Sequence, residues 1–553
     1  MPRTEGATVG RSVGIDLGTT YSAVAVVDES GAPVILRDAE GRATTPSVVL
    51  FETVEGADAP VVGHAAKQQA GVRPDDVVQH VKRHMGDPSW RFDSPADEQY
   101  RPEEISAFIL RALVQRAEVA LGETIRDVVI TVPAYFDDSR RTATRQAGEI
   151  AGLNVLRVLN EPTAAALSYG VAAQADEITV VYDLGGGTFD VSILGIEGND
   201  FAVLATEGDR NLGGFDWDNA LIKLVVQELE DRHGVRDFYD DLDAVAALRE
   251  RAEQAKRELS TSDSAEILVV HGGAERRVTI TREQFETATR SLVRRTQELV
   301  EDTLDAAGIG WSDVSTVVLV GGSTRMPAIR SLIERLSGLT PVEGVDPDQA
   351  VALGAAIQAA LVGGGEAPAG LADVRIADVT SHALGTLALD DDDDQRNWVI
   401  IEKNAKVPAQ GVNVLTTMGP RTQLRVTVTQ GDDPDPDFVT VIGVGIVDLD
   451  EEWPAGVDFA VVYRYDVDQT VTVEIYRLPG DEYVGAFAIE RVANLTAEKV
   501  EEAIDRIDRL AEPAAPAVAL KPAALPGGIL APTASATLTS TMSARPSAAP
   551  SPN

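Results

Sequence analysis

Residues 179–190 read TVVYDLGGGTFD, and residues 12–22 read SVGIDLGTTYS. Each stretch is an apolar, strand-like run that ends in Asp and is followed by a turn of Gly and Thr and then by a second apolar run. A glycine turn lets successive backbone N–H groups approach phosphate oxygens closely, and Thr hydroxyls add further donors. Two such hairpins predict a duplicated domain whose halves face each other across a nucleotide.

Three aspartates in these turns, Asp16, Asp183 and Asp190, are candidate ligands of Mg²⁺. Mg²⁺ binds few carboxylates and keeps most of its hydration, so we expect water to mediate most of the contacts. A single Asp-Leu-Gly turn is usually only a β-turn, but a third glycine pair occurs in LVGGSTR, residues 319–325. The three turns together favour nucleotide binding.

The composition of the chain argues against some classes of partner. The 553 residues carry 48 Lys and Arg against 88 Asp and Glu, a formal net charge of −40. Nucleic acids and anionic membranes attract basic proteins, so we expect neither as a partner, and the charge also opposes self-association and favours a monomer. The sequence has no cysteine and no run of about 20 apolar residues, which predicts a cytoplasmic protein.

The pattern of apolar residues divides the chain into two folded parts. Residues 13–361 alternate strand-like runs with helical periodicity, which is typical of an α/β fold. The predicted strands include residues 127–132, 177–183 and 315–320, and the predicted helices include residues 102–121, 139–151, 241–259 and 282–307. Residues 378–492 contain short β runs such as 397–401, 423–430, 458–465 and 470–476, and one amphipathic helix follows at 496–510.

Six motifs in this order resemble the DnaK-like chaperones of the heat-shock protein 70 (Hsp70) family. They are residues 14–22, 132–136 (VPAYF), 160–166 (NEPTAAA), 183–190, 320–325 and 346–356 (DPDQAVALGAA). The resemblance implies an actin-like, ribonuclease H-like duplicated ATPase domain over 12–362 and an interdomain linker over 363–379. It also implies a β-sandwich of the substrate-binding type over 380–495 and a truncated lid helix over 496–511. The Ala/Pro/Ser/Thr-rich composition of residues 512–553 predicts a disordered tail.

The resemblance also implies which residues bind ATP or ADP. The phosphates would be lined by Asp16, Gly18, Thr19, Thr20, Tyr21, Gly185, Gly186, Gly187 and Thr188, and approached by Gly213 and Gly214. Adenosine would be held by Glu253, Lys256, Ser260, Gly321, Gly322, Ser323, Arg325 and Asp348.

Lys82 would contact the γ-phosphate and position the attacking water, and Glu161 with Pro133 would sense the nucleotide and relay its state through Arg141. The alternatives are that Lys82 is a solvated lysine and that Glu161 only begins a helix before Pro162. Two of the eight lysines fall on nucleotide positions, which favours function for Lys82. His80 and His84, four residues apart, could suggest zinc, but no third ligand is evident, so we expect two exposed histidines.

The chain departs from the family pattern after residue 370. The linker segment 374–378 reads VRIAD, and burial of Arg375 would cost free energy unless it is paired, which predicts weakened interdomain coupling. Thr386 and Leu389 replace larger apolar residues of the peptide cleft. Only one helix follows the β region, so we expect a lidless cleft that exchanges peptide quickly.

The expected function is therefore slow, Mg²⁺-dependent ATP hydrolysis that controls binding and release of unfolded or extended polypeptides. The positions matching J-domain contacts are Arg157, Asn160, Thr163 and Asp378. J-domain and nucleotide-exchange co-chaperones are thus possible partners. The altered linker, cleft and lid leave one alternative open, a nucleotide-switched adaptor that binds one specific partner with little refolding activity.

Overall fold

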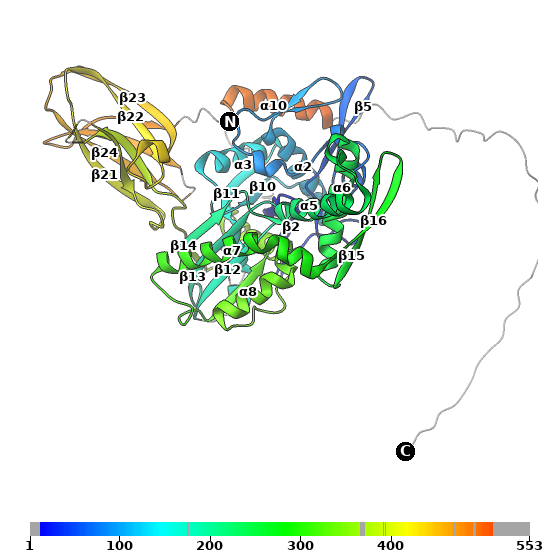
Figure 1. Cartoon of the computed structure of the whole chain (residues 1–553). Helices are drawn as coiled ribbons and strands as arrows, with labels where there is room; N and C mark the ends of the chain where they lie inside the picture. Colours follow the sequence, from blue (N-terminus) through cyan, green and yellow to red (C-terminus); the bar gives the residue numbers. More distant parts are fainter. Residues whose placement is uncertain are drawn as a thin grey trace, which may run out of the picture. The chain divides into compact units, whose positions relative to one another are not determined.

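The computed structural model describes residues 11–173, 176–364, 371–390, 392, 394–467, 470–489 and 494–511 (Figure 1). The tail over 512–553 and linker residues 365–370 lie outside the described residues. Within the described ranges, no helix is long and apolar enough to cross a membrane.

A six-stranded sheet carries the first glycine turn. Its order is β11-β10-β1-β2-β3, with β4 paired to β2. The strands are β1 (Val13–Asp16), β2 (Tyr21–Val27), β3 (Pro33–Ile35), β4 (Thr45–Pro46), β10 (Asp127–Val132) and β11 (Asn154–Asn160). β1 runs antiparallel to β2 and parallel to β10. The turn between β1 and β2 therefore projects beyond one end of these strands.

A five-stranded sheet repeats this arrangement around the second glycine turn. Its order is β17-β12-β13-β14-β18. The strands are β12 (Glu177–Leu184), β13 (Phe189–Glu197), β14 (Asp200–Asp209), β17 (Thr316–Val320) and β18 (Arg375–Ala377). β12 runs antiparallel to β13 and parallel to β17, as β1 does to β2 and β10. The duplication predicted from the two hairpins is confirmed, and so is the actin-like α/β fold that the resemblance implies.

Two small-residue helices join the sheets. α9 (Ala350–Val362) packs on β1, β2 and β10, whereas α4 (Glu161–Ala173) packs on β12 and β13. The helices also pack on each other, so closely that a Cβ on Gly354 would collide with the Ala164 backbone. Because strand side chains alternate in direction, Ala23 and Ala25 face this contact. Val24 and Val26 of the same strand enter the opposite core.

The outer faces of the sheets are covered by longer helices. α2 (Pro102–Leu121) and α3 (Asp138–Ile150) share a core with the first sheet. The second sheet is covered by α5 (Gly214–His233), α6 (Leu242–Leu259), α7 (Arg282–Ala307) and α8 (Pro327–Ser337). The remaining elements are α1 (His64–Gln69), β5 (Val49–Val54), β6 (Ala57–Val62), β7 (Val77–Val78), β8 (Phe92–Asp93), β9 (Gln99–Tyr100), β15 (Ser264–His271), β16 (Ala274–Thr281), η1 (Pro74–Asp76), η2 (Val81–His84), η3 (Phe238–Asp240) and η4 (Gly322–Arg325).

The C-terminal β region is a sandwich, as predicted. One sheet has the order β20-β19-β22-β23 and the other β21-β24-β25-β26, and both contribute to one apolar core. The elements are β19 (Leu384–Leu389), β20 (Gln395–Ile401), β21 (Ala409–Thr416), β22 (Arg421–Gln430), η5 (Pro436–Phe438), β23 (Thr440–Trp453), β24 (Asp458–Tyr465), β25 (Val471–Arg477) and β26 (Glu482–Ala488).

The last helix, α10 (Ala497–Ala511), lies against α3 and α2 (Figure 1). Ile507 is 0% exposed and Ala503 is buried, and both belong to the core of the first sheet. Arg506 pairs with Glu104 at the start of α2, and the Gln146 side chain donates to the Leu495 carbonyl (2.7 Å). The apolar face of α10 is therefore covered by the α/β domain.

The expectation of two exposed histidines is wrong for His80, and the condition considered for Arg375 does not arise. Arg375 is 81% exposed in β18, at the edge of the second sheet, so this structure carries no cost of burying its charge. His80 precedes the 3₁₀ turn η2 in a left-handed conformation (φ 57°), so it does not share a helical face with His84. Burial lowers the pKa of His80 to about 3, and its ring contacts Phe215 (centroids 5.0 Å apart).

Candidate functional site

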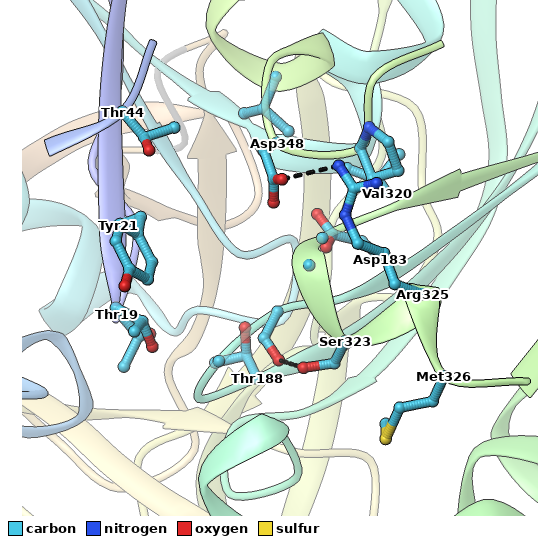
Figure 2. A pocket seen from close by; sticks show the side chains of 18 of the residues that line it. Thr19, Tyr21, Thr44, Asp183, Thr188, Val320, Ser323, Arg325, Met326 and Asp348 are labelled. Carbon is cyan, nitrogen blue, oxygen red and sulfur yellow. Dashed lines mark hydrogen bonds and ion pairs between the residues drawn. The ribbon is translucent and has the colours of Figure 1, made fainter. Parts of the chain in front are cut away.

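A cavity of about 650 Å³ lies where the two glycine turns meet (Figure 2). Most of the predicted nucleotide residues line it. They are Asp16, Gly18, Thr19, Thr20, Tyr21, Lys82, Glu161, Asp183, Gly185, Gly186, Thr188, Glu253, Lys256, Ser260, Gly321, Gly322, Ser323, Arg325 and Asp348. Residues from seven separate stretches of sequence therefore converge on one pocket.

The second turn approaches the first closely because its glycines lack side chains: a Cβ on Gly186 would collide with the Thr20 hydroxyl. Within the first turn, a Cβ on Gly18 would collide with the Tyr21 carbonyl. The first turn is braced by Ser47, whose N–H donates to the Thr20 carbonyl (2.9 Å) and whose hydroxyl donates to the Gly18 carbonyl (2.7 Å). Both turns are thus held in conformations that expose backbone to the cavity.

Four predicted residues lie just outside the lining and support it. A Cβ on Gly213 would come within 2.5 Å of the Gly187 backbone, so these two glycines pack together. The Gly214 N–H donates to the Gly185 carbonyl (2.9 Å). Asp190 is buried, and its Oδ1 accepts from the Tyr135 N–H (2.9 Å). Gly187, Gly213, Gly214 and Asp190 therefore form the support beneath the second turn.

Buried charges gather at one end of the cavity. Lys82 is 3% exposed, and its ammonium group donates to Glu161 Oε1, which excludes a solvated lysine. Glu161 also begins α4, as the helix-start alternative predicts, and its role in sensing the nucleotide stays a prediction. Burial, with the charge of Glu161, raises the pKa of Asp16 to about 7 and that of Asp190 to about 7. The same two causes raise the pKa of Asp183 well above its usual value.

This donor set suits a hydrated divalent cation. Asp16, Asp183 and Asp190 are carboxylates in one buried region, and Oδ2 of Asp190 has no hydrogen-bond partner. A cation would stabilise the charged form of these carboxylates, which burial and the charge of Glu161 disfavour. The structure, over its described residues, has no group of three or more His, Asp or Glu placed to hold a metal directly. The three aspartates therefore suit an ion that they contact mainly through its water ligands.

The far end of the cavity is lined by α6 and by the third glycine pair. The Lys256 ammonium donates to the Gly214 carbonyl (2.9 Å) and to Asp218 Oδ2 (2.9 Å). The Ser323 hydroxyl donates to the Gly185 carbonyl (2.9 Å) (Figure 2). Arg325 pairs with Asp348 (2.8 Å).

Glu253 bridges the two halves of the α/β domain through Lys67 (2.8 Å). Burial opposes the charge of Glu253, but the nearby Lys67 ammonium outweighs it and lowers the pKa of Glu253 to about 2.

Sequence reasoning missed several lining residues. They are Thr44, Arg257, Thr261, Val320, Met326, Arg330, Pro347 and Val351. Arg257 lies over the Tyr21 ring (5.1 Å to the centroid) and pairs with Glu253 (2.7 Å). Its place four residues after Glu253 on one helix was a usable signal, since residues i and i+4 share a face. Thr44 lies in a loop without such a pattern.

The segment that follows β10 connects the pocket to the linker region. Asp190 contacts the Tyr135 backbone from the pocket side. From the other side, Arg141 donates to the Phe136 carbonyl (3.1 Å) and to Asn160, and Asn160 donates to Asp378 (2.8 Å). His382 lies within 3.3 Å of the Tyr135 carbonyl. One short segment is thus in contact with both the acidic pocket and the start of the β region.

The duplicated sheets and facing glycine turns define the actin-like class of nucleotide-binding folds. A family model described as Hsp70 protein matches residues 12–94 and 89–515. The chain is 40% identical over 498 residues to the Chaperone protein DnaK of Halobacterium salinarum, covering 89% of this chain and 76% of that relative. It is 41% identical over 461 residues to the Chaperone protein DnaK of Deinococcus proteolyticus, covering 77% and 70%. The chain therefore belongs to the Hsp70 family and is an Hsp70-type molecular chaperone, which disfavours the adaptor alternative.

Proposed function

We propose that the cavity binds ATP and hydrolyses it slowly to ADP and phosphate with Mg²⁺. The observation that carries the proposal is that two glycine turns, the Lys82–Glu161 pair and the carboxylates of Asp16 and Asp183 line one cavity, with the buried Asp190 just outside the lining. Backbone N–H groups at glycine turns bind phosphate oxygens, and a buried cation offsets charge that develops on them. Membership of the Hsp70 family supports the same reaction.

Each residue has a distinct task in the proposed reaction. The turns at Gly18 and Gly186 orient the phosphates, and Thr19 and Thr188 add hydroxyl donors. Asp16, Asp183 and Asp190 hold Mg²⁺ mainly through its water ligands; when bound, the ion neutralises phosphate charge. Lys82 orients the attacking water, and Glu161 fixes the position of the Lys82 ammonium. Arg257 and Arg325 flank the end of the cavity that receives adenosine.

We also infer that nucleotide state controls how the β-sandwich binds unfolded or extended polypeptides. The segment around Tyr135 supports this coupling, because Asp190 contacts it on one side and His382 on the other. J-domain proteins would act at the surface near Arg157, and exchange factors would open the cleft closed by Lys67 and Glu253. The last described helix, α10, packs on α2 and α3, which supports fast peptide release from the β-sandwich.

The experiment measures binding of ATP and ADP to the full chain by calorimetry, with Mg²⁺ and with EDTA. Affinity that falls in EDTA supports the proposal, and affinity that is the same in both rejects the role of the three aspartates. A fluorescent extended peptide then tests the coupling. Different peptide dissociation rates in ATP and ADP support coupling, and equal rates reject it.

A further inference from the structure

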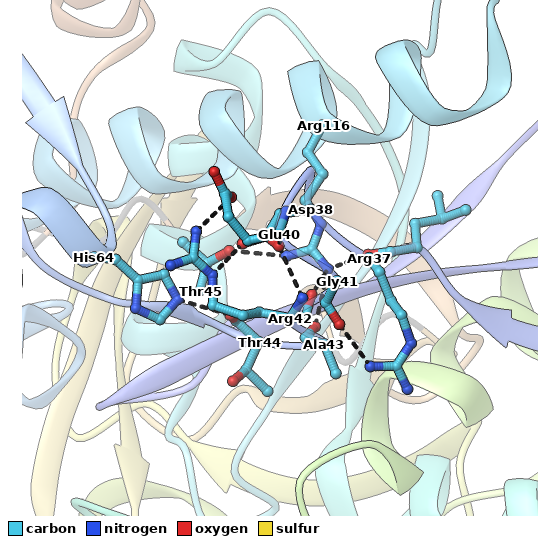
Figure 3. Close-up of polar contacts among 11 residues, drawn as sticks. Arg37, Asp38, Glu40, Gly41, Arg42, Ala43, Thr44, Thr45, His64 and Arg116 are labelled. Carbon is cyan, nitrogen blue, oxygen red and sulfur yellow. Dashed lines mark hydrogen bonds and ion pairs between the residues drawn. The ribbon is translucent and has the colours of Figure 1, made fainter. Parts of the chain in front are cut away.

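The loop of residues 36–44, between β3 and β4, is fastened to the α/β domain mainly by one side chain of α2, and His64 of α1 also contacts the Thr44 carbonyl (3.3 Å) (Figure 3). The Arg116 guanidinium donates to the carbonyls of Arg42 (2.9 Å), Ala43 (3.0 Å) and Leu36. Its other terminal nitrogen donates to the Thr45 hydroxyl (3.0 Å). Four oxygen atoms, from residues at the two ends of the loop, therefore contact one guanidinium group.

The loop is a compact turn in its own right. The Asp38 carboxylate accepts from the backbone N–H groups of Glu40 (3.1 Å) and Arg42 (2.8 Å) and from the Arg42 side chain (2.6 Å). Gly41 has φ 81°, and a Cβ there would meet nothing within 4 Å, so the tip faces open space. Such a turn keeps its internal shape when it moves, and its contact with the body of the domain decides its position.

The base of the loop forms part of the nucleotide pocket. Thr44 lines the cavity on the same wall as Tyr21, across from Arg325 and Asp348 (Figure 2). The next residues pair with the strand that follows the first glycine turn, Thr45 with Ser22 and Pro46 with Tyr21. A shift of the loop away from α2 would therefore displace Thr44 and disturb this pairing.

We infer that Arg116 is a positioning residue for the nucleotide, because it holds the loop of residues 36–44 in the place where Thr44 closes one wall of the pocket. The inference rests on the proposed binding of ATP and ADP in that pocket. A planar guanidinium reaches several carbonyls at once from fixed directions, whereas a lysine ammonium reaches fewer from one point. Arg116 touches none of the residues proposed to hold phosphate or Mg²⁺, so it acts on nucleotide retention and leaves hydrolysis unchanged.

The test is the rate at which a fluorescent ADP analogue leaves the full chain when excess ATP is added. Loss of charge-assisted hydrogen bonds from Arg116→Ala is expected to speed release about tenfold, equivalent to about 1.4 kcal/mol. The ADP release rate of Arg116→Lys is expected to lie between those of Arg116→Ala and the parent. The matched control is Arg111→Ala on the same helix, because Arg111 contacts Asp508 and the Ile507 carbonyl of α10. It should release ADP at the parental rate.

Two further readouts separate positioning from a merely structural role. Turnover at saturating ATP should stay within about twofold of the parent while KM rises, which is the pattern of lost binding. Hydrogen exchange should increase in residues 36–46 of Arg116→Ala and stay parental around Lys82.

Parental release from folded Arg116→Ala or Arg116→Lys overturns the inference, and so does a fall in maximal turnover as large as the change in release. If the parent itself does not bind ADP, the proposed function fails first and the inference with it.

Discussion

The docking of α10 on the ATPase domain gives a prediction that distinguishes a structural helix from a lid over clients. Ile507→Ala removes a fully buried side chain from the core shared by α2, α3 and the first sheet. A large-to-small substitution of this kind costs about 2 to 5 kcal/mol, because methyl groups lose apolar contact and the space closes only in part. We therefore expect the free energy of unfolding of the ATPase domain to fall by that amount.

Urea unfolding of the full chain, followed by tryptophan fluorescence, measures this change. Trp90 packs against the same core and reports on it. The matched control is Glu502→Ala, an exposed position on the same helix, which should keep the parental midpoint and slope. If Ile507→Ala and Glu502→Ala have equal midpoints and Ile507→Ala instead speeds peptide release, the helix serves the β-sandwich and the reasoning is refuted.

Three other predictions follow from buried contacts. Gly354→Ala should lower the unfolding midpoint sharply, because its Cβ would collide with the Ala164 backbone, whereas Gly195→Ala has room (nearest atom 3.9 Å); similar midpoints for the two variants would contradict the close helix contact. Burial lowers the pKa of His382 to about 4 from 6.5, so the unfolded chain binds more protons between these values and stability falls as pH drops from 6.5 toward 4. His382→Gln should flatten that fall by about 2 kcal/mol in urea titrations at pH 7 and 5, and an unchanged slope with pH would argue against a buried neutral ring. Asp190→Asn should raise the melting temperature of the nucleotide-free protein, since one of several crowded carboxylates is neutralised, yet weaken ADP binding in Mg²⁺; a variant that is less stable and binds normally would contradict both effects.

Much of the secondary structure could be predicted because local signals coincide with apolar periodicity. The helix over 102–121 begins with Pro102 and ends before Gly122 in the left-handed conformation, and both ends match the prediction. α3 begins one residue earlier than predicted, because Asp137 caps it by accepting from the Arg140 N–H (2.9 Å). Such boundaries depend on side-chain hydrogen bonds that periodicity does not show.

The site could be predicted where a residue type is tied to a motif, and not where the contact is tertiary. Lys82 and Glu161 are 79 positions apart, so only the family resemblance could bring them together. Arg116 could not be found, because its partners are backbone carbonyls, which every residue carries. The exposure of Arg375 could not be predicted, because it depends on the addition of β18 to the edge of the second sheet with this side chain outward.

Single-turnover ATP hydrolysis by the full chain with Mg²⁺ tests the central claim most directly. The variant is Lys82→Met combined with Glu161→Gln, which removes the charged pair without leaving one buried charge alone. The control is Lys223→Ala, an exposed lysine of α5. The account predicts that the double variant binds ATP and loses about a hundredfold or more in hydrolysis rate while the control is unchanged. Hydrolysis at the parental rate in the double variant would contradict it.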